Sequence, residues 1–472
     1  MSPDDYRSFD ARGLVALLER REVSLAEIYE AAARVAAANS PLKALAWSDF
    51  DAALAAACAR SATGVFRGLP TLLKDLNTFK TGWPATQGSV ALSAGKASFT
   101  SYVVERLEAA GLVPAGQTTT PEFGLSLSCE SPLWGNTLNP FDPSRTPGGS
   151  SGGAAAAVAA GVVPLAHATD SAGSIRIPAA HCGLFGLKPS RGRIPLGPDV
   201  GERMAGLTHC HVLTRSVRDS ALALDVLHGG APGDPYAAPS NGRSFLAACD
   251  GEPKGLRVAL CPDDFDAGPV DPHCRHALQS VAALLAAGGA VVETAAPPIA
   301  LDRLKAAMRT ILVVNLAAAL RRGKVERRKI QPLVREAEEM GQRTPASDYV
   351  DAVLSLHETG RILGRFFQAC DLWITPMTAE PAPAVGAFTL DGTGFAAYFD
   401  RFFGFSPFAM VCSAAGIPAA SVPVHRREPT LPLGVQLAAG MGGEATILGA
   451  AAFLEAAQPW MRCYPAAGRA VQ

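Results

Sequence analysis

Segments with helical periodicity alternate with short apolar segments along the chain, and this alternation is the strongest constraint on its fold. Residues 10–60 repeat apolar side chains at three- and four-residue spacing, with Ser24 and Glu27 placed as a helix-capping box. The stretches 101–118 and 152–190 each predict a helix followed by a strand. Helices that alternate with buried strands form layered α/β proteins. We therefore expect an α/β fold built as a single large domain.

The expected domain divides into four stretches. An N-terminal helical part (1–62) precedes a core (63–230), then a variable helical or cap region (231–370) and a C-terminal core part (371–472). A length of 472 residues is enough for two or three domains. The chain has no fixed-period repeat and no long low-complexity linker, which favours one domain.

Composition excludes several classes of function. Hydrophobic residues make up 48% and charged residues 18%, which favours a globular body over disorder. A formal net charge of −1 gives no basic field to attract nucleic acid or anionic lipid. The start of the chain does not read as a signal peptide, and the ten cysteines form no C-x-x-C pair. We expect a cytoplasmic protein with reduced cysteines, no nucleic-acid partner and no membrane association.

The run GGSSGG at residues 148–153 has several interpretations. As a G-x-S-x-G nucleophile elbow it would make Ser150 a nucleophile, but an elbow needs a strand directly before it and residues 136–147 are rich in proline and turn formers. A phosphate-binding loop would need Gly-Lys-Ser/Thr after the glycines, and alanines follow instead. A flexible linker is the third interpretation. Against it, the glycines lie at the start of an alanine-rich helix, where backbone N–H groups are free.

A second small-residue turn follows closely, at Asp170–Ser174. Such a turn can direct several backbone N–H groups into one concavity, as in an oxyanion hole. Lys74 lies in an apolar segment between Leu73 and Leu76. A lysine there either extends its ammonium to solvent or is desolvated, and desolvation lowers its pKa so that it can act as a base. A buried lysine beside a serine would form a Ser-Lys catalytic pair.

These three segments together resemble the amidase signature family. The resemblance rests on GLPTLLKDLN around Lys74, GGSSGG, and TDSAGSIRIPAAHCGLFGLKPSRGRIP at residues 169–195, and it extends over most of the chain. It is weakest at about 230–370. The run CGLFGLKPSRGRIP is most similar to bacterial members related to cyclic-dimer hydrolases of nylon oligomers. The resemblance implies a mixed β-sheet core sandwiched by α-helices.

The resemblance also implies a role for each matched residue. Ser174 is then the nucleophile, Ser150 a relay serine on a cis peptide bond, and Lys74 the terminal base. The remaining positions support them. The oxyanion hole comes from the N–H groups of Ser171, Ala172, Gly173 and Ser174, and Ser151, Asp170 and Arg176 support the network. Ala172 departs from the glycine that many members carry, and an alanine there requires a negative φ unless strain is tolerated.

The implied activity is hydrolysis of small carboxamides through an acyl-enzyme, with no metal and no cofactor. Phe123, Gly124, Leu125 and Ser126 are expected to bind the substrate, and the phenylalanines of 399–408 either line the pocket or belong to the core. Alternatives stay open: a glutamine-hydrolysing subunit of a tRNA-dependent amidotransferase, an α/β-hydrolase-type esterase that uses Ser150, or a non-catalytic binding protein. The expected partner is a small amide, and a homodimer is the oligomer we allow for.

Overall fold

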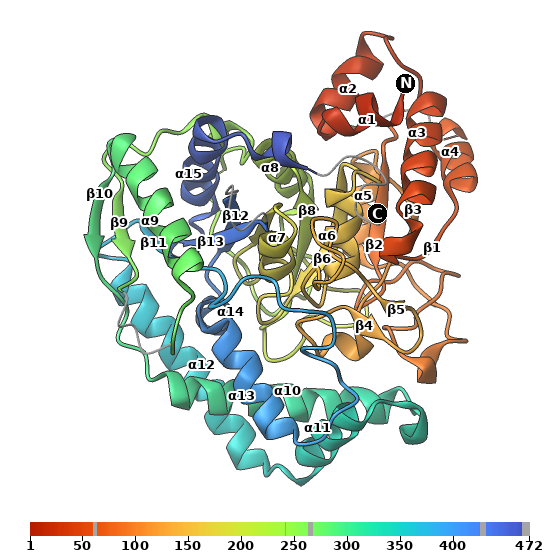
Figure 1. Cartoon of the computed structure of the whole chain (residues 1–472). Helices are drawn as coiled ribbons and strands as arrows, with labels where there is room; N and C mark the ends of the chain where they lie inside the picture. Colours follow the sequence, from red (N-terminus) through yellow and green to blue (C-terminus); the bar gives the residue numbers. More distant parts are fainter. Residues whose placement is uncertain (60–63, 241, 263–267, 425–430, 465–472) are drawn as a thin grey trace.

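An eleven-stranded mixed sheet runs through the centre of the molecule (Figure 1). The computed structural model describes residues 1–59, 64–240, 242–262, 268–424 and 431–464. The strand order along the sheet is β1 (Leu45–Ser48), β3 (Val113–Thr118), β2 (Pro70–Lys74), β6 (Leu165–Asp170), β8 (His209–Thr214), β7 (Phe185–Lys188), β12 (Ala419–Val424), β13 (Leu433–Ala438), β11 (Leu372–Pro376), β9 (Arg257–Leu260) and β10 (Val291–Thr294). A separate short pair joins β4 (Glu130–Ser131) to β5 (Gly135–Asn136). The α/β fold and the single domain are thus confirmed.

The central strands are buried along their whole length. In β2, β6, β8, β12 and β13 every residue is buried, as expected where helices cover both faces of a sheet. Strand β2 runs parallel to β6, with Leu72 opposite Ala166. Strand β6 runs antiparallel to β8, with Asp170 opposite His209. Because β2 and β6 are parallel, their last residues, Lys74 and Asp170, lie at the same edge of the sheet.

Helices pack on both sides of the sheet (Figure 1). They are α1 (Pro3–Ser8), α2 (Ala11–Glu19), α3 (Leu25–Ala38), α4 (Phe50–Ala59), α5 (Tyr102–Ala109), α6 (Gly152–Ala159), α7 (Arg176–His181), α8 (Val217–Leu227), α9 (Pro272–Ala287), α10 (Leu301–Arg322), α11 (Pro332–Arg343), α12 (Ala346–Phe366), α13 (Phe395–Phe405), α14 (Pro407–Ala415) and α15 (Glu444–Ala457). The Ser24–Glu27 capping box starts α3 as expected. Every residue of α6 is buried, and its glycines and alanines allow close approach to neighbouring strands.

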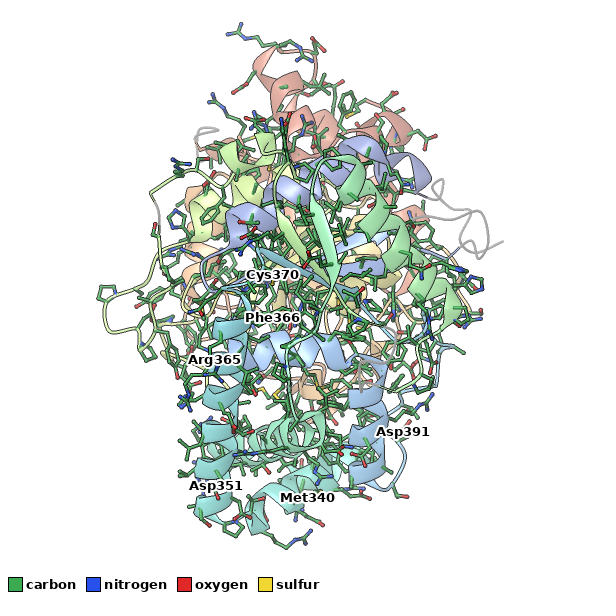
Figure 2. All side chains as sticks on the ribbon, turned by 90° about the vertical axis from the view of Figure 1, so that its left-hand side faces the viewer. Met340, Asp351, Arg365, Phe366, Cys370 and Asp391 are labelled. Atoms are coloured by element: carbon green, nitrogen blue, oxygen red, sulfur yellow. The ribbon has the colours of Figure 1, made fainter. Side chains whose placement is uncertain are left out.

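Residues 231–370 serve two parts of the fold. Strands β9 and β10, with α9 between them, extend one edge of the central sheet. Helix α10 packs against both α11 and α12, and the three form a helical layer below the sheet (Figure 1). In Figure 2, α12, with Asp351 and Arg365 labelled, runs down one side of this layer, opposite α13. The cap expected from the sequence therefore corresponds to α10–α12, while the stretch before it belongs to the sheet.

Two properties of the described residues bear on the protein's environment. None of the helices in this part of the chain is long and apolar enough to span a membrane. Nine cysteines whose side chains the structure describes are free thiols. Seven of them are buried: Cys129, Cys182, Cys210, Cys261, Cys274, Cys370 and Cys412. Burial in an apolar interior is the usual place of a structural cysteine.

Candidate active site

Three segments that are separate in the sequence meet at the carboxyl ends of the central strands β2 and β6. Lys74 is the last residue of β2, and the turn Ser171–Ser174 directly follows β6. Helix α6 leads back into β6, so its start, with Ser150 and Ser151, lies at the same edge. In parallel α/β units this edge, at the carboxyl ends of the strands, is where ligands bind. The topology therefore brings together the lysine and the two serine loops.

Lys74 is fully buried and holds two hydroxyl groups. Its Nζ lies 2.8 Å from Ser150 Oγ and 2.9 Å from Thr169 Oγ1. Burial lowers the pKa of Lys74 to about 7, and the more distant Cys129 and Asp170 oppose this shift. The side chain is therefore desolvated rather than extended to solvent. At neutral pH a large fraction of its amine is uncharged, as a general base requires.

The backbone around Ser150 is fixed on several sides. The Gly149–Ser150 peptide bond is cis, as the resemblance implied. Thr120 donates from its hydroxyl to the Ser150 carbonyl oxygen at 3.0 Å. A Cβ on Gly149 would lie 2.4 Å from the Ser126 carbonyl oxygen, so only glycine fits there. Ser151 donates to the Thr169 carbonyl oxygen at 3.2 Å, which ties the start of α6 to β6.

Asp170 and Arg176 form a buried ion pair beneath the Ser174 turn. Arg176 donates to both carboxylate oxygens, at 2.9 Å each, and also to Gln436 Oε1 at 2.7 Å. Burial alone would raise the pKa of Asp170, but Arg176 lowers it far below its usual value. The carboxylate also accepts from the backbone N–H groups of Gly173, at 2.7 Å, and Ile175, at 3.1 Å. These bonds fix the shape of the turn.

The turn leaves three backbone donors free. Because the Gly173 N–H donates to Asp170, it is not available to a substrate, which differs from the expectation that it belongs to the oxyanion hole. Within the described residues, the N–H groups of Ser171, Ala172 and Ser174 donate to no protein acceptor, and the Ser174 hydroxyl has no hydrogen-bond partner. Gly173 takes φ +115°, whereas Ala172 keeps a negative φ. The alanine therefore fits without strain.

Ser150 and Ser174 open into one cavity of about 510 Å³. This volume is within the usual range for small-molecule sites. Its walls come from several segments: Leu76, Asn77, Gln87, Phe123, Gly124, Leu125, Ser150, Thr169, Ser171, Ala172, Ser174, Asp199, Val200, Glu202, Arg203, Met204, Leu312, Asn315, Leu316, Ala319, Arg322 and Phe402. Apolar and polar side chains contribute about equally to this wall, and the polar ones include hydroxyl, amide and charged groups.

Three of the four expected substrate-binding residues line this cavity. Phe123, Gly124 and Leu125 do so, and Ser126 does not. The Ser126 side chain is buried and donates to the Phe388 carbonyl oxygen at 2.7 Å, so its role is to hold neighbouring chain segments together. Ser126 thus lies outside the wall of this cavity, and its part in substrate binding stays a prediction from the sequence.

Of the phenylalanines in 399–408, Phe402 lines the cavity. The other members of this group are buried in the hydrophobic core: Phe399, Phe403, Phe405 and Phe408. Phe402 is itself largely buried in the core, so it belongs to the core and to the cavity wall at once.

Gly124 lies against Ser150, so we expect this position to be sensitive to an added side chain. A Cβ on this residue would lie 2.5 Å from Leu76 Cδ2 and 3.2 Å from Ser150 Oγ, and its φ is +70°. We expect Gly124→Ala to lower kcat by about tenfold or more, since displacement of a relay group by about 1 Å has a large effect. Steady-state kinetics on a purified variant measures this. A matched control is Gly404→Ala on α13, where an added Cβ meets no atom within 4 Å. Equal losses of kcat in both variants would contradict the placement of Gly124 beside the reacting groups.

Sequence reasoning missed three parts of the site. Thr169, the second partner of Lys74, directly precedes Asp170 and lies inside a motif already singled out, so its position was the available signal. The wall from α10 had no such signal, because its five lining residues repeat at ordinary helical spacing. The loop 199–204, which carries Met204 at φ +56°, was not expected either.

Metal chemistry has no candidate ligand set in the described residues. There, no group of three or more His, Cys, Asp or Glu side chains is placed to hold a metal ion. His209 Nδ1 lies 2.7 Å from the Leu207 carbonyl oxygen, and His211 Nε2 lies 3.0 Å from Ser220 Oγ. These buried histidines of β8 thus have local protein partners.

The family follows from comparison with known proteins. Residues 27–448 match the model of the family described as amidase, and the chain belongs to this family of hydrolases. It is 36% identical to the 6-aminohexanoate-cyclic-dimer hydrolase of Paenarthrobacter ureafaciens, over 97% of this chain and 96% of that protein. The fold superposes on a solved structure of 6-aminohexanoate cyclic dimer hydrolase with a TM-score of 0.93 and 34% identity, covering 99% of both chains.

Two further relatives are named for other activities. A bacterial aryl acylamidase structure of the amidase signature family matches with a TM-score of 0.87 and 26% identity, over 97% of both chains. A glutamyl-tRNA(Gln) amidotransferase component from Aliarcobacter butzleri is 30% identical over 83% of this chain and 88% of that protein. The cyclic-dimer hydrolase is both more similar and matched over more of the chain. The amide hydrolase interpretation is therefore better supported than the amidotransferase one.

Proposed function

We propose that this hydrolase cleaves small carboxamides with Ser174 as nucleophile, Ser150 as proton relay and Lys74 as terminal base. The hydrogen bond of 2.8 Å from Lys74 to Ser150, on a cavity that Ser174 shares, is the observation that carries the proposal. Ser174 is partly exposed, whereas Ser150 is buried. The accessible serine is the one that a substrate can reach.

The proton follows a short path in this mechanism. The neutral amine of Lys74 takes a proton from Ser150 Oγ, and Ser150 takes one from Ser174 Oγ as that oxygen attacks the amide carbon. The proton then returns through Ser150 to the leaving nitrogen, which departs as an amine. Water attacks the acyl ester by the same relay, releases the carboxylic acid and restores Ser174. The Ser150–Ser174 hydrogen bond is formed as substrate binds, as is common for catalytic contacts.

The free backbone donors of the turn stabilise the charged intermediate. When Ser174 attacks, negative charge develops on the former carbonyl oxygen. The N–H groups of Ser171, Ala172 and Ser174 are unused by the described protein groups and are our candidates for its donors. Asp170 fixes the turn through the Gly173 N–H, so Gly173 contributes by shaping the hole.

The pKa of Lys74 predicts how activity depends on pH. Because the amine must be neutral to accept a proton, kcat/KM should rise about tenfold per pH unit below pH 7 and level off above it. A pH profile with a neutral substrate measures this. Lys188, also buried with a pKa of about 7, lies outside the relay, so Lys188→Met is the control and should keep the midpoint. A midpoint lost in that variant would reject Lys74 as the titrating base.

The substrate class follows from the cavity and the relatives. A cavity of about 510 Å³ with apolar side chains over about half of its wall suits aryl, alkyl or oligomeric amides. The relatives' names include a hydrolase of a cyclic amide dimer and an aryl acylamidase. The test is a hydrolysis screen of cyclic and linear 6-aminohexanoate oligomers, anilides, aliphatic amides and glutamine. We expect turnover of anilides or oligomers. Turnover of glutamine alone, with a co-purifying protein partner, would instead support the amidotransferase role.

A cytoplasmic location and a homodimer stay predictions from the sequence. Gel filtration with light scattering tests the dimer, and fractionation of the host cell tests the location. Neither property is needed for the proposed chemistry, because every proposed catalytic group comes from one chain.

A further inference from the structure

The wall that α10 contributes to the cavity changes character along the helix. Leu312, Asn315, Leu316, Ala319 and Arg322 line the cavity at spacings of three, one, three and three residues, which place them on one face. This wall is about 15 Å long at about 1.5 Å per residue. Three of its side chains, Leu312, Leu316 and Ala319, are apolar, Asn315 lies between them, and the wall ends with Arg322, the last residue of the helix.

The charged groups around the cavity are mostly matched with one another. Asp199 is paired with Arg203 at 2.6 Å. Glu202 accepts from the Gly206 N–H, and Arg191 lies near enough for the two charges to interact. Asp199 thus has an ion-pair partner, and Glu202 has a cation near enough for the two charges to interact.

Arg322 is the exception. Within the described residues its guanidinium is exposed and makes no ion pair or hydrogen bond with another group. Two neighbouring cations, Arg321 and Lys324, are likewise unpaired there, whereas Arg327, Arg328 and Lys329 further along are paired with glutamates. The cavity therefore meets excess positive charge at the C-terminal end of α10, and local positive charge attracts anionic substrates.

We propose that Arg322 binds an anionic group, most simply a carboxylate, at the end of the substrate away from the apolar part of the α10 wall. The inference rests on the proposed function, since it names the kind of amide that the site accepts: one with an apolar chain and a carboxylate end. Arginine suits this role because its planar guanidinium pairs with both carboxylate oxygens. A neutral amide of the same length binds the apolar wall alone.

Matched substrate pairs test the proposal. On the acyl side, the mono-4-nitroanilides of butanedioic, hexanedioic and octanedioic acids are compared with the 4-nitroanilides of butanoic, hexanoic and octanoic acids. On the amine side, N-hexanoyl-6-aminohexanoate is compared with N-hexylhexanamide. In each pair, one substrate ends in a carboxylate and its partner ends in a methyl group. We expect the carboxylate substrate to have a kcat/KM about five- to tenfold higher than its methyl-terminated partner in at least one series, which is the effect expected of a partly exposed charge pair. The series that shows the preference identifies the side of the scissile bond that faces Arg322.

Two variants separate the cavity residue from its neighbour. Arg322→Gln should remove the preference, so that kcat/KM of the carboxylate substrate falls to the value of its methyl-terminated partner in the same variant. Arg321→Gln is the matched control, because Arg321 is an adjacent exposed arginine outside the cavity wall, and it should keep the preference. Equal rates for both members in both series, or a preference that survives Arg322→Gln, would overturn the proposal.

A binding measurement keeps this test independent of turnover. In Ser174→Ala, octanoate should raise the thermal midpoint of unfolding more than octan-1-ol does at the same concentration, and the added Arg322→Gln should remove the difference. If no amide is hydrolysed but this difference is seen, the proposed function fails and the anion subsite stands. If amides are hydrolysed and the difference is absent, the anion subsite fails alone.

Discussion

Replacing Ser174 with alanine is expected to lower kcat by on the order of 10⁴-fold or more, the scale of removing a serine nucleophile. The physical reason is that Ser174 carries the one hydroxyl of this turn that has no protein partner among the described residues and lies beside free backbone N–H donors. The other hydroxyl of the turn, on Ser171, is paired with Thr208 Oγ1. The variant should stay folded, since the Ser174 hydroxyl makes no hydrogen bond in the described part of the chain. Turnover of the best substrate from the screen, together with the thermal midpoint of unfolding, measures both effects.

Ser171→Ala is the matched control for that variant. Ser171 lines the same cavity, and its hydroxyl pairs with Thr208 Oγ1 at 2.8 Å rather than with the relay. The substitution keeps the backbone N–H, so the donor for the oxyanion remains. We expect a loss of less than about tenfold in kcat. Undiminished turnover by Ser174→Ala, or an equal collapse in Ser171→Ala, would contradict the assigned roles.

Lys74→Met is expected to remove most activity and, at the same time, to stabilise the fold. Without the amine, Ser150 has no base, and kcat should fall by on the order of 10³-fold. Methionine fills a similar volume and needs no solvation, so the cost of burying an ammonium disappears. Two hydroxyl partners, Ser150 and Thr169, are left without the amine, which offsets part of the gain.

The lowered pKa of Lys74 determines how its contribution to the free energy of unfolding changes with pH. Burial lowers the pKa of folded Lys74 to about 7, whereas a lysine in an unfolded chain has a pKa of about 10.4. Between these values the unfolded chain binds more protons, so the stability contributed by Lys74 rises with pH through this window. The unfavourable contribution is largest below pH 7.

We therefore expect Lys74→Met to raise the free energy of unfolding by about 1–3 kcal/mol at pH 6 and by progressively less toward pH 10. Denaturant unfolding at several pH values measures the difference between variant and wild type. Lys188→Met should show a similar pH trend, because Lys188 is equally buried with a pKa of about 7, without loss of the relay. A gain that grows with pH, or none at pH 6, would contradict the burial of a lysine with a lowered pKa.

The alternation of helices and strands was enough to predict the fold class. The motifs were enough to single out the residues that meet in the candidate site. Lys74, Ser150 and Ser174 are far apart in the sequence, yet each lies near a strand end or helix start that the local pattern marked. A G-x-S-x-G match alone pointed to Ser150 as a nucleophile. In the structure this serine is the buried partner of Lys74 and shares its cavity with the accessible Ser174.

The rest of the site depends on contacts that no local pattern records. The Gly173 N–H is used by Asp170 because the turn folds back on its own strand end, and a sequence motif does not say which N–H groups remain free. Ser126 follows the cavity-lining turn directly, but its hydroxyl bonds to the backbone of Phe388, from a distant part of the chain. The α10 wall likewise arises from packing between distant segments. Such long-range packing decides which side chains reach a substrate.

Covalent labelling is the most direct test of the central claim that Ser174, and not Ser150, is the nucleophile. The wild-type protein is treated with a fluorophosphonate at pH 8, and the modified peptide is located by mass spectrometry. The proposed mechanism predicts one adduct on Ser174, lost in Ser174→Ala and slowed strongly in Lys74→Met. An adduct on Ser150, or equal labelling of Ser174→Ala, would contradict it.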